Sequence, residues 1–183
     1  NNKVINQYKI HTNDELKNLK LKIITSHDDS YNDIGNITKM TMSKYATKFN
    51  FDFEFKKMPV TGRAQTWNKI KLLKEELLKK NNDFIMWIDA DAFFHNESEN
   101  ILSVLDKKHQ MFLTSHYCSV HKGSNFKNTI LTTKRLNAGV MIFKVSDFNI
   151  EFMDVVWNHT KFINNFMYEQ AAIMDLIGLR ADI

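Results

Sequence analysis

The feature that most constrains the fold of this chain is an apolar run that ends in two carboxylates. The run is Phe84–Ile88, and Asp89 and Asp91 follow it directly. Five consecutive apolar residues that include isoleucine and aromatics predict a strand buried on both faces. Two carboxylates at the end of such a strand repel each other and lose hydration, so they need a compensating charge. A divalent cation supplies that charge, and carboxylate oxygens suit Mg²⁺ or Mn²⁺.

Composition restricts the classes to which the chain can belong. Its 183 residues fit one domain, and a hydrophobic share of 43% is ample for a core. No apolar run approaches the roughly 18 residues of a membrane span, so no span is expected. The single cysteine, Cys118, excludes an intrachain disulfide and a cysteine-based zinc site. The net charge of +4 is modest and dispersed, which disfavours a nucleic-acid partner.

Segments with strand and helix patterns alternate along the chain. This alternation predicts an α/β domain with a mostly parallel central sheet flanked by helices. Thr66 and Ser98 are the expected N-caps of two of the helices. The predicted strands are residues 21–26, 51–55, 84–88, 111–114 and 140–143, and the predicted helices are residues 33–49, 66–80, 98–105, 147–164 and 168–179.

Candidate ligand-binding residues stand where predicted strands end. Ligands of open α/β sheets bind beyond the carboxyl ends of the strands. Thr25 and Ser26 end the first predicted strand, and Asp89, Ala90 and Asp91 follow the third. Side chains at positions i and i+2 of an extended segment share a face, so one cation can be reached by both aspartates. An Asp-x-Asp pair that merely caps a turn is the alternative.

Two further segments carry polar residues beside apolar runs. Asn137 and Gly139 precede a predicted strand, where an amide can bind sugar hydroxyls and glycine allows a close backbone approach. Glu169 and Gln170 open the last predicted helix, where an acidic residue also stabilises the helix dipole. Each segment also has a purely structural reading, as a turn that enters a strand and as a helix start.

In this order, the segments resemble those of nucleotide-sugar glycosyltransferases with the GT-A fold. The resemblance is strongest to the family of fungal Golgi galactosyl- and mannosyltransferases and plant xyloglucan xylosyltransferases, and it covers residues 21–178. The glycogenin and bacterial galactosyltransferase group shares the Asp-x-Asp and Asn-Ala-Gly elements and is the rival family. The matching segments are Trp67-Asn68-Lys69, residues 87–92, residues 136–139 and Tyr168-Glu169-Gln170.

The resemblance implies a UDP- or GDP-sugar donor, a glycan or protein acceptor, and Mn²⁺ or Mg²⁺ as the metal. It implies that Asp91 binds the metal, and that Asp89 binds the metal or the donor. The other residues implied to bind the donor are Thr25, Ser26, Arg63, Lys69, Ala90, Asn137, Ala138 and Gly139. Glu169 and Gln170 are the implied catalytic residues, close to the anomeric carbon.

The implied reaction transfers a sugar to an acceptor hydroxyl, and the resembled families retain the anomeric configuration. An inverting enzyme would instead need a carboxylate base beside the acceptor, and the sequence does not separate the two. Relatives usually take a third metal ligand, a histidine, from a segment after the acidic-Gln helix, and no histidine here matches that position. We therefore assign no histidine as a metal ligand. We treat residues 1–183 as a single domain that could lack a C-terminal segment.

Other functional classes stay open. A catalytically degenerate module that binds nucleotide sugars or serves as a scaffold would have the same motifs. A nucleotidyltransferase usually has a glycine-rich phosphate loop, which this chain lacks. A haloacid-type phosphatase needs its Asp-x-Asp on the first strand, whereas here another strand precedes it. The compartment is also open, since the resemblance implies the Golgi lumen while a lone thiol equally fits the cytoplasm.

Overall fold

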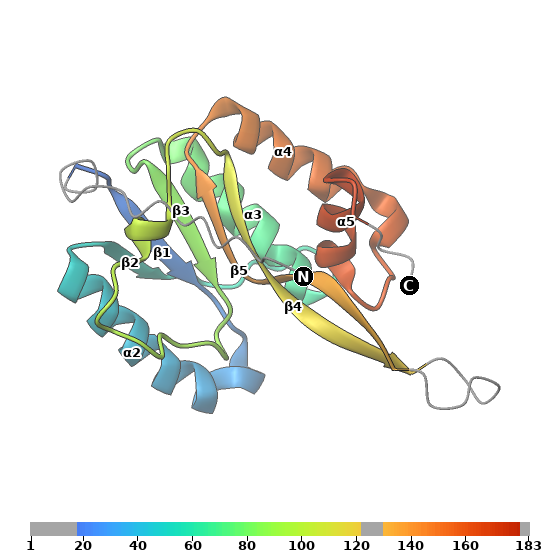
Figure 1. Cartoon of the computed structure of the whole chain (residues 1–183), viewed down its shortest axis with the longest axis horizontal. Coiled ribbons are helices and arrows are strands. Elements are labelled where there is room, and N and C mark those ends of the chain that lie inside the picture. The colour runs from blue at the N-terminus through green and yellow to red at the C-terminus, as the bar shows by residue number, and fades with distance from the viewer. Residues whose placement is uncertain (1–17, 122–129, 180–183) are drawn as a thin grey trace, which may run out of the picture.

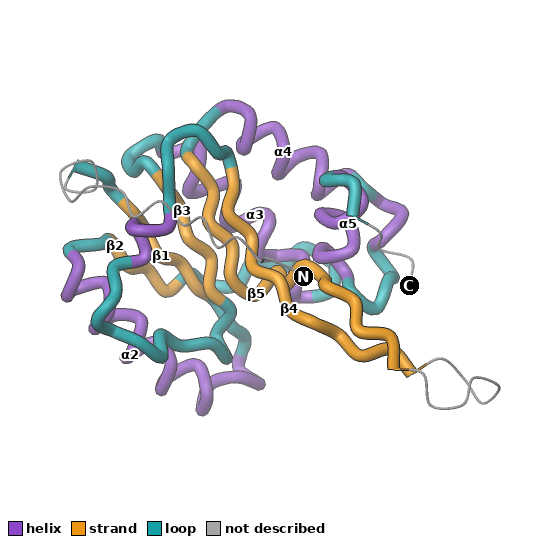
Figure 2. The backbone as a smooth tube through the Cα atoms, in the orientation of Figure 1, coloured by secondary structure: helices purple, strands orange, loops and turns teal. Residues whose placement is uncertain are grey.

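The structure is a computed structural model that describes residues 18–121 and 130–179. One five-stranded sheet has the strand order β2-β1-β3-β5-β4 and lies between helices (Figures 1 and 2). Its strands are β1 (Leu21–Thr25), β2 (Asp52–Phe55), β3 (Phe84–Ile88), β4 (Met111–His121) and β5 (Ile130–Lys144). The helices are α2 (Asn32–Phe49), α3 (Asn68–Lys79), α4 (Asp147–Asn158) and α5 (Tyr168–Leu176).

The sheet is mixed, but all its strands except β5 run in one direction. β1 pairs in parallel with both β2 and β3. β5 pairs antiparallel with β3 and with β4, so β4 again points the same way as β3. The predicted α/β class with a mostly parallel sheet is therefore confirmed, and the reversed β5 is the feature that the pattern did not predict. The parallel pairing of β1 and β3 brings their carboxyl ends to the same edge of the sheet.

The apolar residues of β3 serve two separate cores, because successive side chains of a strand point to opposite faces. Ile85 and Trp87 belong to the core that the sheet forms with α3, α4 and α5. Phe84, Met86 and Ile88 belong to the core on the other face, beneath α2. All five side chains are at most 2% exposed, as the predicted strand buried on both faces requires.

β4 and β5 form a hairpin that continues beyond the other strands (Figure 1). Residues 140–144 of β5 pair with β3, whereas residues 130–137 pair with β4 alone. The β4 register steps from Leu113, opposite Met141, to Thr114, opposite Asn137. Residues 138–140 therefore have no partner on β4 and form a bulge, the kind of irregularity that redirects side chains beside active sites. The two strands predicted here, 111–114 and 140–143, are each longer in the structure.

Several predicted helix boundaries were wrong. Thr66 does not cap α3, because residues 65–67 form a 3₁₀ turn and the helix starts at Asn68 without a side-chain cap. The predicted helix at 98–105 is only a 3₁₀ turn over Ile101–Val104, and Asn100 caps it instead of Ser98. The last two helices end at residues 158 and 176, earlier than expected. Among the described residues, no helix is long and apolar enough to cross a membrane.

Candidate active site

The side chain of Lys69 lies where four segments of the chain meet. Its Nζ is 2.9 Å from Asp89 Oδ1, 3.1 Å from Glu169 Oε1 and 3.2 Å from the carbonyl oxygen of Ala138. The residue is only 5% exposed, although the lysine-rich sequence of α3 is typical of a solvated helix face. Burial alone lowers the pKa of this ammonium group, but Glu169 and Asp89 outweigh burial, and the pKa rises above its ordinary value. Lys69 is therefore a buried cation that joins the motifs.

Both the backbone and the side chain of Asp89 are fixed by hydrogen bonds. Its amide donates to the carbonyl oxygen of Gly139 at 2.7 Å, and its own carbonyl oxygen accepts from the amide of Ala92, which closes a turn. Its Oδ1 accepts from Lys69 and from Trp87 Nε1, the latter at 2.6 Å. Trp87 and Asp89 share a face because they are two residues apart in an extended segment. Oδ1 is thus committed to the protein, and Oδ2 is the oxygen that a ligand can reach.

Asp91 differs from Asp89 in its surroundings. Its side chain is exposed, and it makes no hydrogen bond or ion pair within the described ranges 18–121 and 130–179. Both aspartates line a cavity of about 160 Å³ at the carboxyl ends of β1 and β3. The expected meeting of the first and third strand ends at one cleft is therefore found, since Ser26 and Ala90 line the same cavity.

The bulge brings the Asn-Ala-Gly segment against the carboxylates. A Cβ added at Gly139 would lie 2.7 Å from Asn137 Oδ1 and 3.2 Å from Asp89 Oδ2, so only glycine fits. The Gly139 amide donates to Asn137 Oδ1 at 2.7 Å, which leaves the Asn137 NH₂ group to donate to a ligand. Thr114 Oγ1 on β4 lies 2.9 Å from the carbonyl oxygen of Asn137 and 3.0 Å from that of Val140, a contact that braces the bulge.

Glu169 and Gln170, at the start of α5, have different surroundings. Glu169 is 3% exposed, and its Oε1 faces Lys69, whereas its Oε2 is buried without a hydrogen-bond partner in the described part of the chain. Gln170 Oε1 accepts from the amide of Ala138 at 3.0 Å, so this side chain braces the bulge. Tyr168 precedes them with a φ of 48°, a left-handed conformation that is rare for a bulky residue. The strain coincides with the turn that directs Glu169 inward.

The remaining predicted donor residues are divided by the structure. Ser26 lines the cavity, and its hydroxyl donates to the carbonyl oxygen of Lys56 at 2.8 Å. Thr25 is buried beside it but is not among the cavity residues. Arg63 lies outside the cavity as well: it stacks on Trp157, with its Cζ 4.0 Å from the ring centroid, and donates to the Trp157 carbonyl oxygen. Burial lowers the pKa of the Arg63 guanidinium. The structure thus gives Arg63 a packing role.

Sequence reasoning missed other residues of the cavity. Trp87 lies in the segment 87–92 of the family resemblance, but it was not predicted to line the site. The others stand in no predicted motif, and of these only His27 and Asp28, directly after Ser26, had a position that could have indicated them. The His27 ring packs against Phe55 with the ring centroids 4.7 Å apart and the planes tilted by 57°, and Nε2 is buried without a partner among the described residues. The cavity residues that were not predicted are His27, Asp28, Tyr31, Met58, Gln65, Thr66 and Trp87.

The donor atoms at this edge fit a hard divalent cation in part. Asp91 and Asp89 Oδ2 offer carboxylate oxygens, the ligand type that Mg²⁺ and Mn²⁺ prefer, and they leave positions open for diphosphate oxygens. Within the described residues, no three His, Cys, Asp or Glu side chains gather into a metal site. The residues present therefore fit a cation that completes its coordination with ligand or solvent oxygens.

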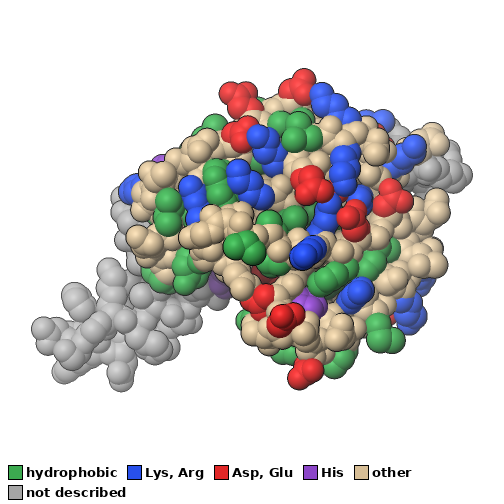
Figure 3. Space-filling view, turned by 180° about the vertical axis from the view of Figure 1, so that it is seen from behind, with side chains coloured by type: hydrophobic (Ala, Val, Ile, Leu, Met, Phe, Trp, Pro, Cys, Tyr) green, Lys and Arg blue, Asp and Glu red, His purple; other side chains and the backbone are tan. Residues whose placement is uncertain are grey.

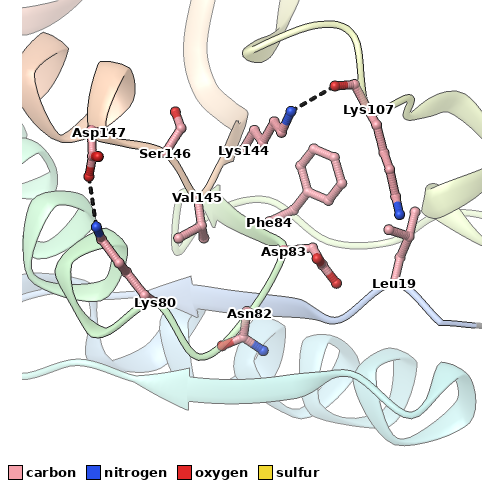
Figure 4. Close-up of a pocket in the computed structure, with 10 residues that line it drawn as sticks. All are labelled: Leu19, Lys80, Asn82, Asp83, Phe84, Lys107, Lys144, Val145, Ser146 and Asp147. Atoms are coloured by element: carbon pink, nitrogen blue, oxygen red, sulfur yellow. Dashed lines mark hydrogen bonds and ion pairs between the residues drawn. The ribbon is translucent and has the colours of Figure 1, made fainter.

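A larger hollow of about 530 Å³ lies at the opposite edge of the sheet, where β1 and β3 begin (Figure 4). It contains none of the predicted site residues. Lys80 pairs with Asp147 at 2.7 Å and Lys144 donates to the Lys107 carbonyl oxygen at 2.7 Å, and both contacts are exposed. On the face seen in Figure 3, basic and acidic side chains are likewise interspersed. The smaller cavity is the better candidate, because it holds the buried charges.

Comparison with known proteins identifies the family of this chain. The profile of the galactosyl transferase GMA12/MNN10 family matches residues 21–183, so the chain belongs to this family and is a glycosyltransferase. The chain is similar to the crystal structure of a glycosyltransferase involved in the glycosylation of the major capsid of PBCV-1. The two share 18% identity and a TM-score of 0.61, over 86% of this chain and 75% of that one, which supports a glycosyltransferase fold.

A weaker similarity links the chain to the glycosyltransferase GlyE of Streptococcus pneumoniae TIGR4. The identity is 12% and the TM-score 0.47, over 87% of this chain and 43% of that one. Curated protein sequences give no significant match.

Proposed function

We propose that this glycosyltransferase moves a hexosyl or pentosyl group from a UDP- or GDP-sugar to a hydroxyl of a glycan or protein acceptor, with a divalent cation. The observation that carries the proposal is the convergence on Lys69. One buried ammonium group contacts Asp89, Glu169 and the Ala138 carbonyl. These residues come from four separate motifs, and a fixed cation of this kind is suited to a substrate whose leaving group is a diphosphate.

In this proposal, Asp91 and Asp89 Oδ2 hold the cation, Mn²⁺ or Mg²⁺. When bound, the cation neutralises charge that develops on the departing diphosphate. Lys69 stays protonated because its pKa is raised, so it adds a second positive charge beside the phosphates. The Asn137 NH₂ group is available to a sugar hydroxyl, and Gly139 leaves room for it.

Glu169 is the proposed catalytic residue. Its buried Oε2 lacks a partner in the described part of the chain, and such an acceptor can stabilise positive charge at the anomeric carbon. Gln170 is bound to the Ala138 amide, so we propose that it acts by holding the bulge. Retention of the anomeric configuration is part of the proposal and rests on the family resemblance.

The test is a screen of UDP- and GDP-sugars for hydrolysis and transfer, with and without Mn²⁺, on the wild-type chain and on Asp91→Asn. We expect cation-dependent turnover in the wild type and a loss on the order of 100-fold in the variant, since a direct ligand is removed. Asp147→Asn, at the far edge of the sheet, is the matched control and should keep full activity. Full activity of Asp91→Asn would refute the assignment.

The second candidate function is a nucleotide-sugar-binding module without catalysis. The observation in its favour is that no three potential metal ligands come together within the described residues. Calorimetric titration with UDP, with and without Mn²⁺, separates the two functions. Metal-dependent UDP binding without turnover of any donor would favour the module.

A further inference from the structure

The Asp-x-Asp turn has a contact with α2 that lies outside the predicted site. Thr38 Oγ1 is 2.5 Å from the carbonyl oxygen of Ala90, and both residues are buried. The same hydroxyl is 3.2 Å from the carbonyl oxygens of Ile34 and Gly35, the usual acceptors for a threonine within a helix. A hydroxyl has one hydrogen to donate, and Ala90 is the nearest acceptor. The hydrogen bond therefore ties α2 to the turn.

This hydrogen bond fixes the part of the turn on which Asp91 depends. The Ala90 carbonyl belongs to the planar peptide group that joins Ala90 to Asp91, so holding the oxygen also orients the bond from which Asp91 extends. Asp89 is held directly by Lys69 and Trp87. Asp91 has no comparable side-chain contact within the described residues, so only the backbone fixes the direction of its Cα–Cβ bond.

A second contact shows that the first turns of α2 reach both walls of the cleft. The His27 ring, after β1, packs on Gly35 so closely that an added Cβ would lie 2.2 Å from its Cδ2 and 2.3 Å from its Nε2. One turn later on the helix, Thr38 holds Ala90 after β3. His27 and Ala90 both line the cavity. The start of α2 therefore contacts residues that follow both strand ends.

We propose that Thr38 is a positioning residue for this turn, and that its hydroxyl orients the Asp91 carboxylate toward the cation. The inference rests on the proposed function, in which Asp91 binds the cation. Thr38 touches neither substrate nor metal and acts only through the Ala90–Asp91 peptide. Partners of this indirect kind typically change metal affinity by about 10- to 100-fold when they are removed.

The experiment compares Thr38→Val, which keeps the shape of the side chain but lacks the hydroxyl, with Thr38→Ser, which keeps the hydroxyl. UDP is titrated calorimetrically with and without Mn²⁺, and Tm is measured in parallel. Thr38→Val should weaken Mn²⁺-dependent UDP binding by roughly 10-fold, with metal-free UDP binding unchanged and with rescue by Thr38→Ser. Thr41→Val is the matched control, because among the described residues the Thr41 hydroxyl bonds only to the Thr38 carbonyl, within α2.

The outcomes separate this inference from the function on which it rests. If Thr38→Val binds UDP and Mn²⁺ as the wild type does, or only its Tm falls, the positioning role is refuted and the function stands. If the wild type shows no Mn²⁺-dependent binding of UDP, and none of GDP in the same titration, both are refuted. If Thr38→Val does not fold, Thr38→Ala takes its place and is compared with Thr38→Ser. Equal affinities of Thr38→Ala and Thr38→Ser for UDP with Mn²⁺ would refute the inference.

Discussion

Two clusters of buried charge lie along α3, and they differ in how completely their atoms are satisfied. The site cluster is Lys69, Asp89 and Glu169. The structural cluster is Lys22, Glu54, Lys56 and Glu76, between α3 and the β1–β2 edge. Glu76 is 2% exposed, yet both its oxygens are used: Oε2 accepts from Lys22 at 2.8 Å, and Oε1 pairs with Lys56 and Lys79. In the site cluster, Glu169 Oε2 has no partner in the described part of the chain.

This difference supports our proposal that the site cluster, and not the structural cluster, binds a ligand. Buried polar groups of folded proteins are almost all hydrogen-bonded, so an unsatisfied one needs an explanation. The structural cluster is closed, and nothing remains for a ligand to do. Lys69 and Asp89 of the site cluster line a cavity together with Asp91. Within the described residues, Glu169 Oε2 and the Asp91 side chain have no hydrogen-bond partner. The unsatisfied carboxylate oxygen of Glu169 is thus the feature that sets the site cluster apart from the structural one.

The pKa shifts of Glu76 and Lys56 reflect how completely the charges of the structural cluster are paired. Burial, the largest single effect on Glu76, raises its pKa, but hydrogen bonds from Lys22, Lys56 and Lys79 outweigh burial and bring the pKa to about 2. The pKa of Lys56 is raised, because Glu75 and Glu76 outweigh the opposing effect of burial. A carboxylate whose folded-state pKa is lowered stabilises the fold above its ordinary pKa of 4.5. This stability is lost as the pH falls toward about 2.

The largest expected effect follows from replacing Lys69, the positively charged side chain of the site cluster. Lys69→Met leaves the buried Glu169 carboxylate beside the partly exposed Asp89 without a positive charge, which should cost about 3–5 kcal/mol of stability. Nucleotide-sugar turnover should be lost as well. Thermal unfolding and donor hydrolysis measure the two effects. A Lys69→Met chain as stable and active as the wild type would break the comparison.

The structural cluster should respond in stability alone. Glu76→Gln removes the more deeply buried of the two anions that Lys22 and Lys56 share, which should cost about 2 kcal/mol above pH 4.5, with turnover per folded molecule unchanged. Below that pH the wild type should lose its advantage, so the Tm of Glu76→Gln should change less between pH 4.5 and 2. Glu75→Gln, on a more exposed residue of the same helix, is the control.

The close approach at Gly139 sharpens the comparison within the site. In Gly139→Ala, the new Cβ displaces Asn137 Oδ1 or Asp89 Oδ2, and we expect kcat/KM to fall by roughly 10-fold. Gly62→Ala is a useful contrast, because Gly62 has a φ of 75° but nothing within 4 Å of an added Cβ. It should lower Tm through backbone strain without affecting turnover. Equal kcat/KM values for Gly139→Ala and the wild type would show that the bulge tolerates movement.

The smallest effect is expected at the larger hollow. Asp147→Asn removes the ion pair with Lys80. The Asp147 side chain is 89% exposed and the Lys80 side chain 57%. Exposed pairs of this kind are worth at most about 1 kcal/mol, so Tm should barely change. A large loss of stability or of turnover in Asp147→Asn would mean that this edge of the sheet contributes to stability or catalysis more than an exposed ion pair can explain.

Much of the fold could be predicted from local pattern. The run Phe84–Ile88 was predicted as a doubly buried strand because no polar residue interrupts it, and the structure agrees. Helix ends were predicted less well, because caps such as Asn100 depend on hydrogen bonds that composition does not reveal. The reversed direction of β5 was not predicted, since a strand has the same side-chain pattern in either direction.

The candidate site was predicted through its motifs, and the structure refined which of their residues meet. Lys69, Asp89 and Glu169 come together, as do Ser26 and Asp91 at the cavity. Arg63 is engaged with Trp157, a partner 94 positions away that no local pattern could indicate. Thr38 was missed for the same reason, because its acceptor, the Ala90 carbonyl, is 52 positions away.

The sequence by itself determined the buried strand, the α/β class and the presence of two aspartates at a strand end. These follow from short-range periodicity and from the cost of burying unpaired charge. Only the tertiary structure decided which lysine of α3 is buried, which carboxylate oxygen lacks a partner and which helix holds the turn. Each of these depends on distances between atoms far apart in the chain, and folding brings such atoms together through packing that the local sequence does not encode.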